Sequence, residues 1–173
     1  MNDMTDTIAS TLVPDFRKAM RRLAATVTLI STTDASGRRH GMAATAVNSV
    51  TMDPPTLLIC VNQTASLHAP LIEQGRFCIN VLMPSHHELV GHFSGQKTGE
   101  DRFESGDWRL EEACGLPYLH GAQCNLFCRV VSVTPVGTHS VIIAAVETVH
   151  VHDDVMPLIY ANGRLHAVGD TVA

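Results

Sequence analysis

The sequence predicts a mostly-β protein built on an antiparallel barrel, closed or nearly closed, with a few short helices. Three observations support this fold class. Short runs of apolar or alternating apolar and polar residues recur along most of the 173-residue chain, each bounded by turn-forming residues. Several neighbouring runs are joined by short turns, as in β-hairpins. The chain has no regular alternation of strands with crossover helices, which argues against a parallel βαβ architecture.

Length and charge limit the classes of protein to consider. A chain of 173 residues is most simply one domain, and we expect that domain over residues 13–170, after a flexible lead-in at residues 1–12. The formal net charge of −5 argues against a nucleic-acid-binding surface. No apolar run approaches the ~20 residues of a membrane helix, and the acidic N-terminus lacks a signal-peptide pattern. We therefore expect a cytoplasmic protein with no nucleic-acid or membrane partner.

The first expected helix lies within residues 14–25, "PDFRKAMRRLAA". Its apolar residues recur at helical spacing, and Pro14 stands at its start, where proline is tolerated. Its opposite face carries four basic residues, Arg17, Lys18, Arg21 and Arg22. We interpret this face as solvated, with contact to a cofactor phosphate as the alternative.

A β-hairpin is expected next, because residues 26–33 and 40–51 alternate on either side of the turn "DASG". Pro54 and Pro55 cannot lie in the middle of a sheet, so they predict a bend. The strand that follows, over residues 56–61, is apolar on both faces and is expected to be central.

Two short helices and a strand are expected between residues 66 and 95. The first helix has Ser66 as its N-cap and Gly75 at its end. A strand follows at residues 76–83. The second helix is indicated by Ser85 and Glu88, which have the spacing of a capping box.

The C-terminal half combines a long irregular stretch with two hairpins. Residues 96–121 are polar and lack periodicity, which predicts a long loop. Residues 125–151 predict a hairpin about "GTH". Asn162-Gly163, between two short alternating runs, is the strongest short hairpin signal in the chain.

The strand expected over residues 40–51 is rich in Ala, Thr, Asn and Ser, where a core strand would carry larger apolar residues. Small side chains let another molecule approach the backbone, and hydroxyl and amide groups offer hydrogen bonds. Farther along, "VNQTAS" at residues 61–66 leaves a strand and opens a helix, where backbone N–H groups can hold an anion. A flat ring on the strand with a phosphate at the helix start would satisfy both features. Tight sheet packing explains the small residues equally well.

The cysteines and histidines do not indicate a metal site. The five cysteines are odd in number, and Cys60, Cys78 and Cys128 lie in apolar runs typical of buried free thiols in a reducing compartment. His150 and His152 share a strand face, but a strand end followed by an acidic turn explains them better. We assign no metal ligand.

Four segments together resemble the short-chain flavin reductase family, whose fold is an FMN-binding split barrel. They are "GMAATAVNSVTMDPPTLLICVN", "FCINVL", "VGTHSVIIAAVE" and "PLIYANGRLHAV". The resemblance covers roughly residues 15–168 and includes "HFSGQKT…RF…W". It is strongest to the reductase components of two-component monooxygenases, such as those serving 4-hydroxyphenylacetate or phenol hydroxylases, and to the reductase of pyrimidine utilisation.

The resemblance also implies site residues. The segment matching 42–49 lies along the flavin ring in such reductases, which assigns to flavin binding Met42, Ala43, Thr45, Ala46, Asn48 and Ser49. The segment matching 61–66 receives the ribityl and phosphate end, which adds Asn62, Thr64 and Ser66. Further positions that border or pack near the pocket are His92, Phe93, Tyr160 and Arg164.

The turn Gly137-Thr138-His139 matches a "G-D-H" turn of the family. This match places His139 beside the nicotinamide, as the catalytic residue, while Thr138 departs from the common Asp. The resemblance implies a homodimeric NAD(P)H:flavin oxidoreductase that reduces FAD or FMN with NADH, or with NADPH as the alternative donor. The reduced flavin would pass to a separate oxygenase component.

Two other functions remain open at this point. One is a non-catalytic flavin-binding carrier or sensor on the same barrel. The other is a pyridoxal- or haem-handling enzyme, although "VNQTAS" lacks the lysine and arginine clamp of a pyridoxal phosphate site.

Overall fold

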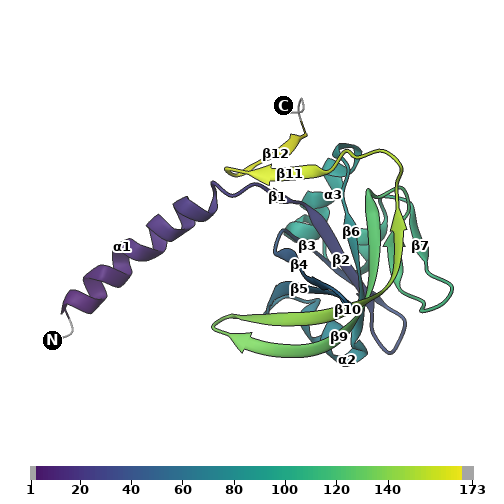
Figure 1. Ribbon diagram of the computed structural model, residues 1–173, viewed down its shortest axis with the longest axis horizontal. Coiled ribbons are helices and arrows are strands. Elements are labelled where there is room, and N and C mark those ends of the chain that lie inside the picture. Colours follow the sequence, from purple (N-terminus) through teal and green to yellow (C-terminus); the bar gives the residue numbers. More distant parts are fainter. Residues whose placement is uncertain (1–2, 169–173) are drawn as a thin grey trace.

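A seven-stranded sheet forms the body of the protein (Figure 1). The computed structural model describes residues 3–168, with side chains from residue 12 onward. In spatial order the strands are β3 (Arg39–Ala44), β2 (Thr28–Thr33), β6 (Arg76–Val81), β9 (Cys124–Val136), β10 (His139–Val151), β5 (Pro55–Asn62) and β4 (Val47–Met52). Every neighbouring pair is antiparallel. The predicted mostly-β, antiparallel class is confirmed.

The two edge strands of this sheet are joined by only Thr45 and Ala46. β3 ends at Ala44 and β4 begins at Val47, yet the two strands stand at opposite ends of the sheet. The amide of Cys60, in β5, donates to the carbonyl of Ala46 at 3.2 Å. Because so short a link keeps the edges close in space, the sheet must curl until β3 and β4 approach each other. The result is a barrel that stays split at this seam.

The single strand expected over residues 40–51 is therefore wrong. It is two strands, one on each edge, with the chain crossing the seam between them. Alternation alone cannot reveal such a break, because the small residues on both sides of it fit a continuous strand equally well. The hairpin about residues 34–37 is confirmed, since β2 pairs with β3.

The sheet is buried on both faces near β2. Leu29 and Ile30 are neighbours in sequence and are both fully buried, but they belong to different apolar clusters. The Ile30 cluster includes Phe77 and Ile142, and the Leu29 cluster includes Phe93. Alternate side chains of one strand thus enter two separate cores, which makes β2 a rigid base for its edge neighbour β3.

The helix expected to begin at Ser66 is α2 (His68–Gln74). It ends as predicted at Gly75, whose φ of 65° is the left-handed conformation that glycine favours. Its N-cap is Leu67, without a side-chain hydrogen bond, so Ser66 as the N-cap is wrong. The Ser66 hydroxyl instead meets Arg102, from a distant part of the chain.

The second expected helix is divided into shorter turns. A 3-10 turn, η1 (Pro84–His86), precedes α3 (His87–Gly91), and a π turn, η2 (His92–Gln96), follows it. The capping box of Ser85 and Glu88 is wrong, because Met83 precedes the first turn and His86 precedes α3.

The long loop expected over residues 96–121 contains ordered elements. These are the 3-10 helix η3 (Gly99–Phe103) and the paired strands β7 (Trp108–Leu110) and β8 (Pro117–Leu119). The Phe103 ring lies 5.1 Å from Phe93 and 4.8 Å from Trp108, measured between centroids. This aromatic cluster packs the stretch against the sheet and explains its order without a long apolar run.

The N-terminal helix α1 (Asp3–Met20) projects away from the sheets (Figure 1). It begins well before Pro14, so residues 3–12, part of the flexible lead-in expected at residues 1–12, are helical. Beyond its C-terminal end lies a three-stranded sheet of β1 (Ala25–Thr26), β11 (Leu158–Ala161) and β12 (Arg164–Ala167). β11 and β12 form the hairpin predicted about Asn162-Gly163, where both residues have positive φ. Over residues 3–168, no helix combines the length and hydropathy needed to cross a membrane.

Candidate functional site

A cavity of about 780 Å³ opens beside the seam of the barrel, and we call it the seam cavity. One wall is the crossing segment itself, from Thr45 through Ala46 to Asn48. The end of α1 forms another wall with Arg17 and Arg21. The remaining lining residues include Met20, Leu23, Thr26, Thr28, Val81 and Tyr160. The cavity thus lies between a small-residue strand edge and a basic helix end.

A smaller cavity of about 260 Å³ lies against the same crossing segment. It shares Thr45 and Tyr160 with the seam cavity and adds Ala43 of β3. Ser94 and Leu165 complete much of its wall. Thr45 and Tyr160 therefore line both cavities.

The structure brings together five residues that the sequence assigned to flavin binding: Ala43, Thr45, Ala46, Asn48 and Tyr160. Two others of the same segment lie differently. Met42 packs against the main apolar cluster. Ser49 is exposed on β4, opposite Leu57 of β5. The split of the strand changes which side chains face the cavity.

The loop that follows β5 forms a polar turn. The Asn62 side-chain carbonyl accepts hydrogen bonds from the amide and the hydroxyl of Thr64, both at 2.9 Å. This arrangement fixes the turn through local side-chain bonding. Thr64 and Ser66 are both exposed, so their hydroxyl groups face the outside of the barrel wall.

Arg102 brings a cation to this turn. Its Nη1 donates to the carbonyl of Gly41 at 2.6 Å and lies 3.1 Å from the Ser66 Oγ. Its Nε donates to the carbonyl of Lys97 at 3.0 Å. We call Asn62, Thr64, Ser66 and Arg102 the anion cradle. A guanidinium beside the Ser66 hydroxyl has the chemistry to bind a phosphate.

Sequence reasoning missed Arg102. It lies in the stretch "HFSGQKT…RF…W" that carried part of the resemblance, but 36 positions separate it from Ser66. The segment "VNQTAS" has no basic residue of its own, and the long-range contact supplies one. Only the tertiary structure could reveal that pairing.

Ion pairs hold the segment that carries Arg102 against β3. The Arg39 Nη2 lies 2.7 Å from the Glu100 carboxylate, and the Arg39 guanidinium also stacks over Phe103, 4.7 Å from the ring centroid. Partial burial tends to raise the pKa of Glu100, but the hydrogen bonds and charge of Arg39 outweigh it, so this pKa is lowered. The carboxylate thus stays charged and paired, which positions η3 and Arg102.

A second pair stabilises the turn before β3. Asp34 accepts hydrogen bonds from the Ser36 hydroxyl at 2.6 Å and lies 2.9 Å from His40 Nε2. These contacts, first that of Ser36 and then that of His40, hold the pKa of Asp34 far below its ordinary value.

His139 lies beside the anion cradle rather than on the seam cavity. It begins β10 and is the register partner of Asn62. Its Nδ1 is 2.9 Å from the Thr138 hydroxyl, and its carbonyl accepts from Gln63 Nε2 at 3.2 Å. The His139 side chain is exposed beside the polar turn that follows β5. Its backbone is held on both sides, because β10 pairs with β5 and with β9.

The remaining predicted residues divide between the core and the surface. Phe93 is buried in the aromatic cluster and packs directly on Gly41 of β3, so it positions the strand. Next to it, the Nδ1 of His92 is buried without a hydrogen-bond partner among the described residues. Arg164 is exposed on β12, and its neighbour Leu165 lines the smaller cavity instead.

Metal ligation and thiol chemistry find no support in the described structure. Among the side chains of residues 12–168, no three His, Cys, Asp or Glu are grouped so as to bind a metal ion. Cys78 and Cys128 are buried, as expected, whereas Cys60 is only partly so. Burial raises the pKa of Cys128 to about 12, which keeps it a protonated, unreactive thiol.

The fold and the two parts of the site define a split-barrel protein with a cavity at its seam and an anion cradle that contacts β3. The family model described as "Flavin reductase like domain" matches residues 20–169. The chain therefore belongs to the flavin reductase family, as the sequence resemblance predicted.

Two relatives show how close the similarity is. The chain is 39% identical over 159 residues to FMN reductase (NADH) RutF of Pantoea ananatis, which covers 92% of this chain and 83% of that protein. It is 41% identical over 153 residues to the 4-hydroxyphenylacetate 3-monooxygenase reductase component of Pseudomonas aeruginosa, covering 87% and 89%.

Solved structures give the same result for the fold. The NADH:FAD oxidoreductase of Streptomyces globisporus, in complex with NAD and FAD fragments, superposes with a TM-score of 0.82 at 26% identity, covering 89% of this chain and 91% of that chain. The styrene monooxygenase flavin reductase of Pseudomonas putida superposes with a TM-score of 0.82 at 26% identity, covering 91% and 99%. The split barrel predicted from the sequence is thus the fold of these reductases.

Proposed function

We propose that this protein is an NADH-dependent flavin reductase that reduces FAD or FMN and supplies the reduced flavin to a separate monooxygenase. The observation that carries the proposal is that a chain of the flavin reductase family has both a seam cavity and an anion cradle. The relatives named above are an NADH-dependent FMN reductase and a monooxygenase reductase component. We further propose a cytoplasmic homodimer, with NADPH as the alternative donor.

The residues present fit a flavin in two respects. The crossing segment offers Ala43, Ala46 and the backbone of Thr45 to a flat ring, with no large side chain between the ring and the strand. The anion cradle offers Arg102 and Ser66 to a phosphate. Both parts are attached to β3, through Ala43 and through the Gly41 carbonyl, so one strand would orient both ends of the cofactor.

The chemistry of the reduction resides in the cofactors, because a bound flavin accepts a hydride from the nicotinamide at its ring. The protein then has to orient two rings and hold the anionic tail. Thr45 and Asn48 are exposed, so the crossing segment is accessible from solvent. An accessible site suits a reduced flavin that must leave for another protein.

The direct test is oxidation of NADH by the purified protein with FMN or FAD added, followed by the absorbance of NADH, with a flavin-free sample as the control. We expect turnover only when flavin is present. An Arg102→Gln variant should lose flavin-dependent turnover at low flavin concentration, whereas Arg109→Gln, which changes an exposed pair with Asp107, should not.

The same sample separates the proposal from the alternative of a carrier or sensor. In the absence of oxygen, NADH should bleach the spectrum of the bound flavin. Tight flavin binding with a spectrum that NADH leaves unchanged would support the carrier and remove the reductase.

A further inference from the structure

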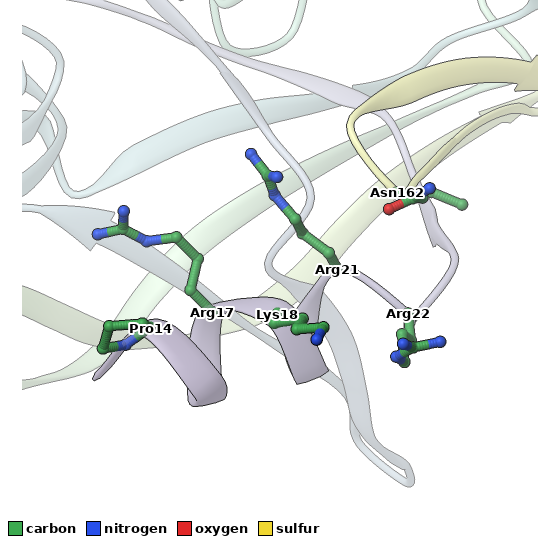
Figure 2. Close-up of a pocket in the computed structure, with 7 residues that line it drawn as sticks. Pro14, Arg17, Lys18, Arg21, Arg22 and Asn162 are labelled. Atoms are coloured by element: carbon green, nitrogen blue, oxygen red, sulfur yellow. The ribbon is translucent and has the colours of Figure 1, made fainter. Parts of the chain in front are cut away.

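Four basic side chains gather around a second cavity, of about 570 Å³, at the C-terminal end of α1 (Figure 2). They are Arg17, Lys18, Arg21 and Arg22. Pro14, Ala161 and Asn162 complete the lining, so no acidic residue contributes to it. We call it the four-cation cavity. The chain has only 12 Lys and Arg residues and a net charge of −5, so composition alone does not explain this concentration of positive charge.

Two elements build this cavity. Arg17 lies in the last turn of α1 and Arg21 directly follows the helix, where its amide donates to the carbonyl of Arg17 at 3.1 Å. Their side chains extend to the same side, as Figure 2 shows. The turn between β11 and β12 forms the facing part, where the amide of Asn162 donates to the carbonyl of Arg21 at 2.8 Å. Asn162 has a φ of 49°, the positive value required by this tight turn. The hydrogen bond ties the turn to the helix end and fixes the shape of the cavity.

Across residues 12–168, these positive charges have no paired carboxylate. Like charges gathered around one cavity repel each other, which is unfavourable at this end of α1. A bound anion would relieve this repulsion.

The four-cation cavity adjoins the seam cavity. Arg17 and Arg21 line both of them. On the far wall of the seam cavity are Thr45, Ala46 and Asn48, the segment proposed to carry the flavin ring. A ligand with a ring in the seam cavity and an anionic group a short distance away could therefore occupy both.

We infer that the four-cation cavity binds the diphosphate of a dinucleotide, one of whose two ring systems lies in the seam cavity. This inference rests on the proposed function, which supplies two dinucleotides, FAD and NADH. The flavin phosphate already has the anion cradle of Ser66 and Arg102. The nicotinamide dinucleotide is therefore the ligand of the four-cation cavity, with arginine and lysine donating charge-assisted hydrogen bonds to its phosphate oxygens.

The test uses a Lys18→Gln/Arg22→Gln double variant, because these two residues line the four-cation cavity and not the seam cavity. We expect kcat/KM for NADH to fall at least about tenfold, which corresponds to ~1.4 kcal/mol. Reduced nicotinamide riboside has no phosphate, so its kcat/KM should stay nearly constant. The KM for FMN and for FAD should also stay nearly constant.

The control is Arg76→Gln/Arg129→Gln, which removes the same charge from the two arginines paired with Glu147. It should leave all four parameters near those of the parent protein. An unchanged kcat/KM for NADH, an equal loss with the riboside, or a change confined to FAD would each overturn the inference.

A binding measurement separates this inference from the proposed function. Titration calorimetry of the flavin-free protein with ADP should detect binding that the Lys18→Gln/Arg22→Gln variant weakens at least about tenfold. Failure of the parent protein to bind ADP would overturn the inference whatever its activity. If ADP binds as expected but NADH is not oxidised with either flavin, the proposed function fails and the diphosphate site stands.

Discussion

Arg102 and Ser66 are 36 positions apart in sequence, yet the Nη1 of the guanidinium lies 3.1 Å from the hydroxyl oxygen. The same nitrogen donates to the carbonyl of Gly41 at 2.6 Å. One side chain thus joins β3, proposed to lie along the flavin ring, to the turn proposed to hold its phosphate. A change at Arg102 should affect phosphate binding more than ring binding, which leads to the first prediction.

Replacement of Arg102 by Gln should weaken the binding of FMN by about ten- to a hundredfold, since charge-assisted hydrogen bonds contribute roughly 1.5–3 kcal/mol. Riboflavin has the same ring but no phosphate, so its affinity should change little. Quenching of flavin fluorescence measures both. An equal loss of affinity for riboflavin would show that Arg102 acts by holding β3 rather than by binding the phosphate.

The second prediction concerns the contact between Gly41 and Phe93. A Cβ atom added at Gly41 would stand 2.5 Å from Phe93 Cε1. The ring cannot retreat easily, because it is buried against Phe103 and Trp108. Replacement of Gly41 by Ala should therefore lower the free energy of unfolding by about 1–3 kcal/mol, the usual cost of overpacking.

The double variant Gly41→Ala/Phe93→Leu tests the cause of this loss. A smaller side chain at position 93 leaves space for the added methyl group, so the two changes together should cost less than the sum of the single changes. Denaturant unfolding of the four proteins measures this coupling. If the losses in unfolding free energy of the two single variants simply add, the strain of Gly41→Ala does not arise from its contact with Phe93.

Hairpins and turns were the features best predicted from the sequence. Gly75 ends α2 and Asn162-Gly163 closes β11 onto β12, because a residue with positive φ is a local requirement that one or two positions reveal. The strand over 40–51 failed for the opposite reason. The strand breaks at Thr45 and Ala46 because the chain passes there from one edge of the sheet to the other. This arrangement depends on the whole sheet, so no local sequence pattern predicts it.

The candidate site follows the same division. Thr45, Ala46 and Asn48 were found by local composition and resemblance, and they do line one cavity. Arg102 was missed because its partner lies on another segment. The four basic residues at the end of α1 are exposed, as the sequence indicated, but a helical pattern cannot show that the turn at Asn162 lies opposite them.

The third prediction concerns pH. His86 is partly buried, and this burial lowers its pKa from the ordinary value of 6.5. Its Nδ1 accepts a hydrogen bond from the Met83 amide at 3.2 Å, which requires the neutral ring. As the pH falls, His86 is therefore protonated at a higher pH in the unfolded chain than in the folded protein. The contribution of His86 to stability is complete above pH 6.5 and is lost as the pH falls toward the lower folded pKa.

Replacement of His86 by Asn keeps a hydrogen-bond acceptor near the same place, but the side-chain amide of asparagine does not titrate. The free energy of unfolding of His86→Asn should thus fall less steeply than that of the parent protein as the pH is lowered from about 7 to about 5. Urea unfolding at several pH values gives the slopes. His87→Asn, at the exposed neighbour, should leave the parent slope unchanged; identical slopes in all three proteins would contradict the prediction.

The last prediction concerns His139, which stands at the start of β10 opposite Asn62. Its carbonyl accepts from Gln63 and its ring nitrogen lies 2.9 Å from the Thr138 hydroxyl, so an exposed imidazole is fixed at the mouth of the polar turn. A fixed, exposed group here suits contact with an incoming nicotinamide better than retention of the flavin. His139→Ala should therefore slow reduction of bound flavin by NADH about tenfold, the effect of one lost positioned hydrogen bond, with flavin affinity nearly unchanged. Thr138→Ala removes the hydroxyl that holds the His139 imidazole but leaves the imidazole itself present. It should therefore slow the reduction of bound flavin by less than His139→Ala does. Stopped-flow reduction under anaerobic conditions measures the rate, and weaker flavin binding with a normal rate would assign His139 to the flavin instead.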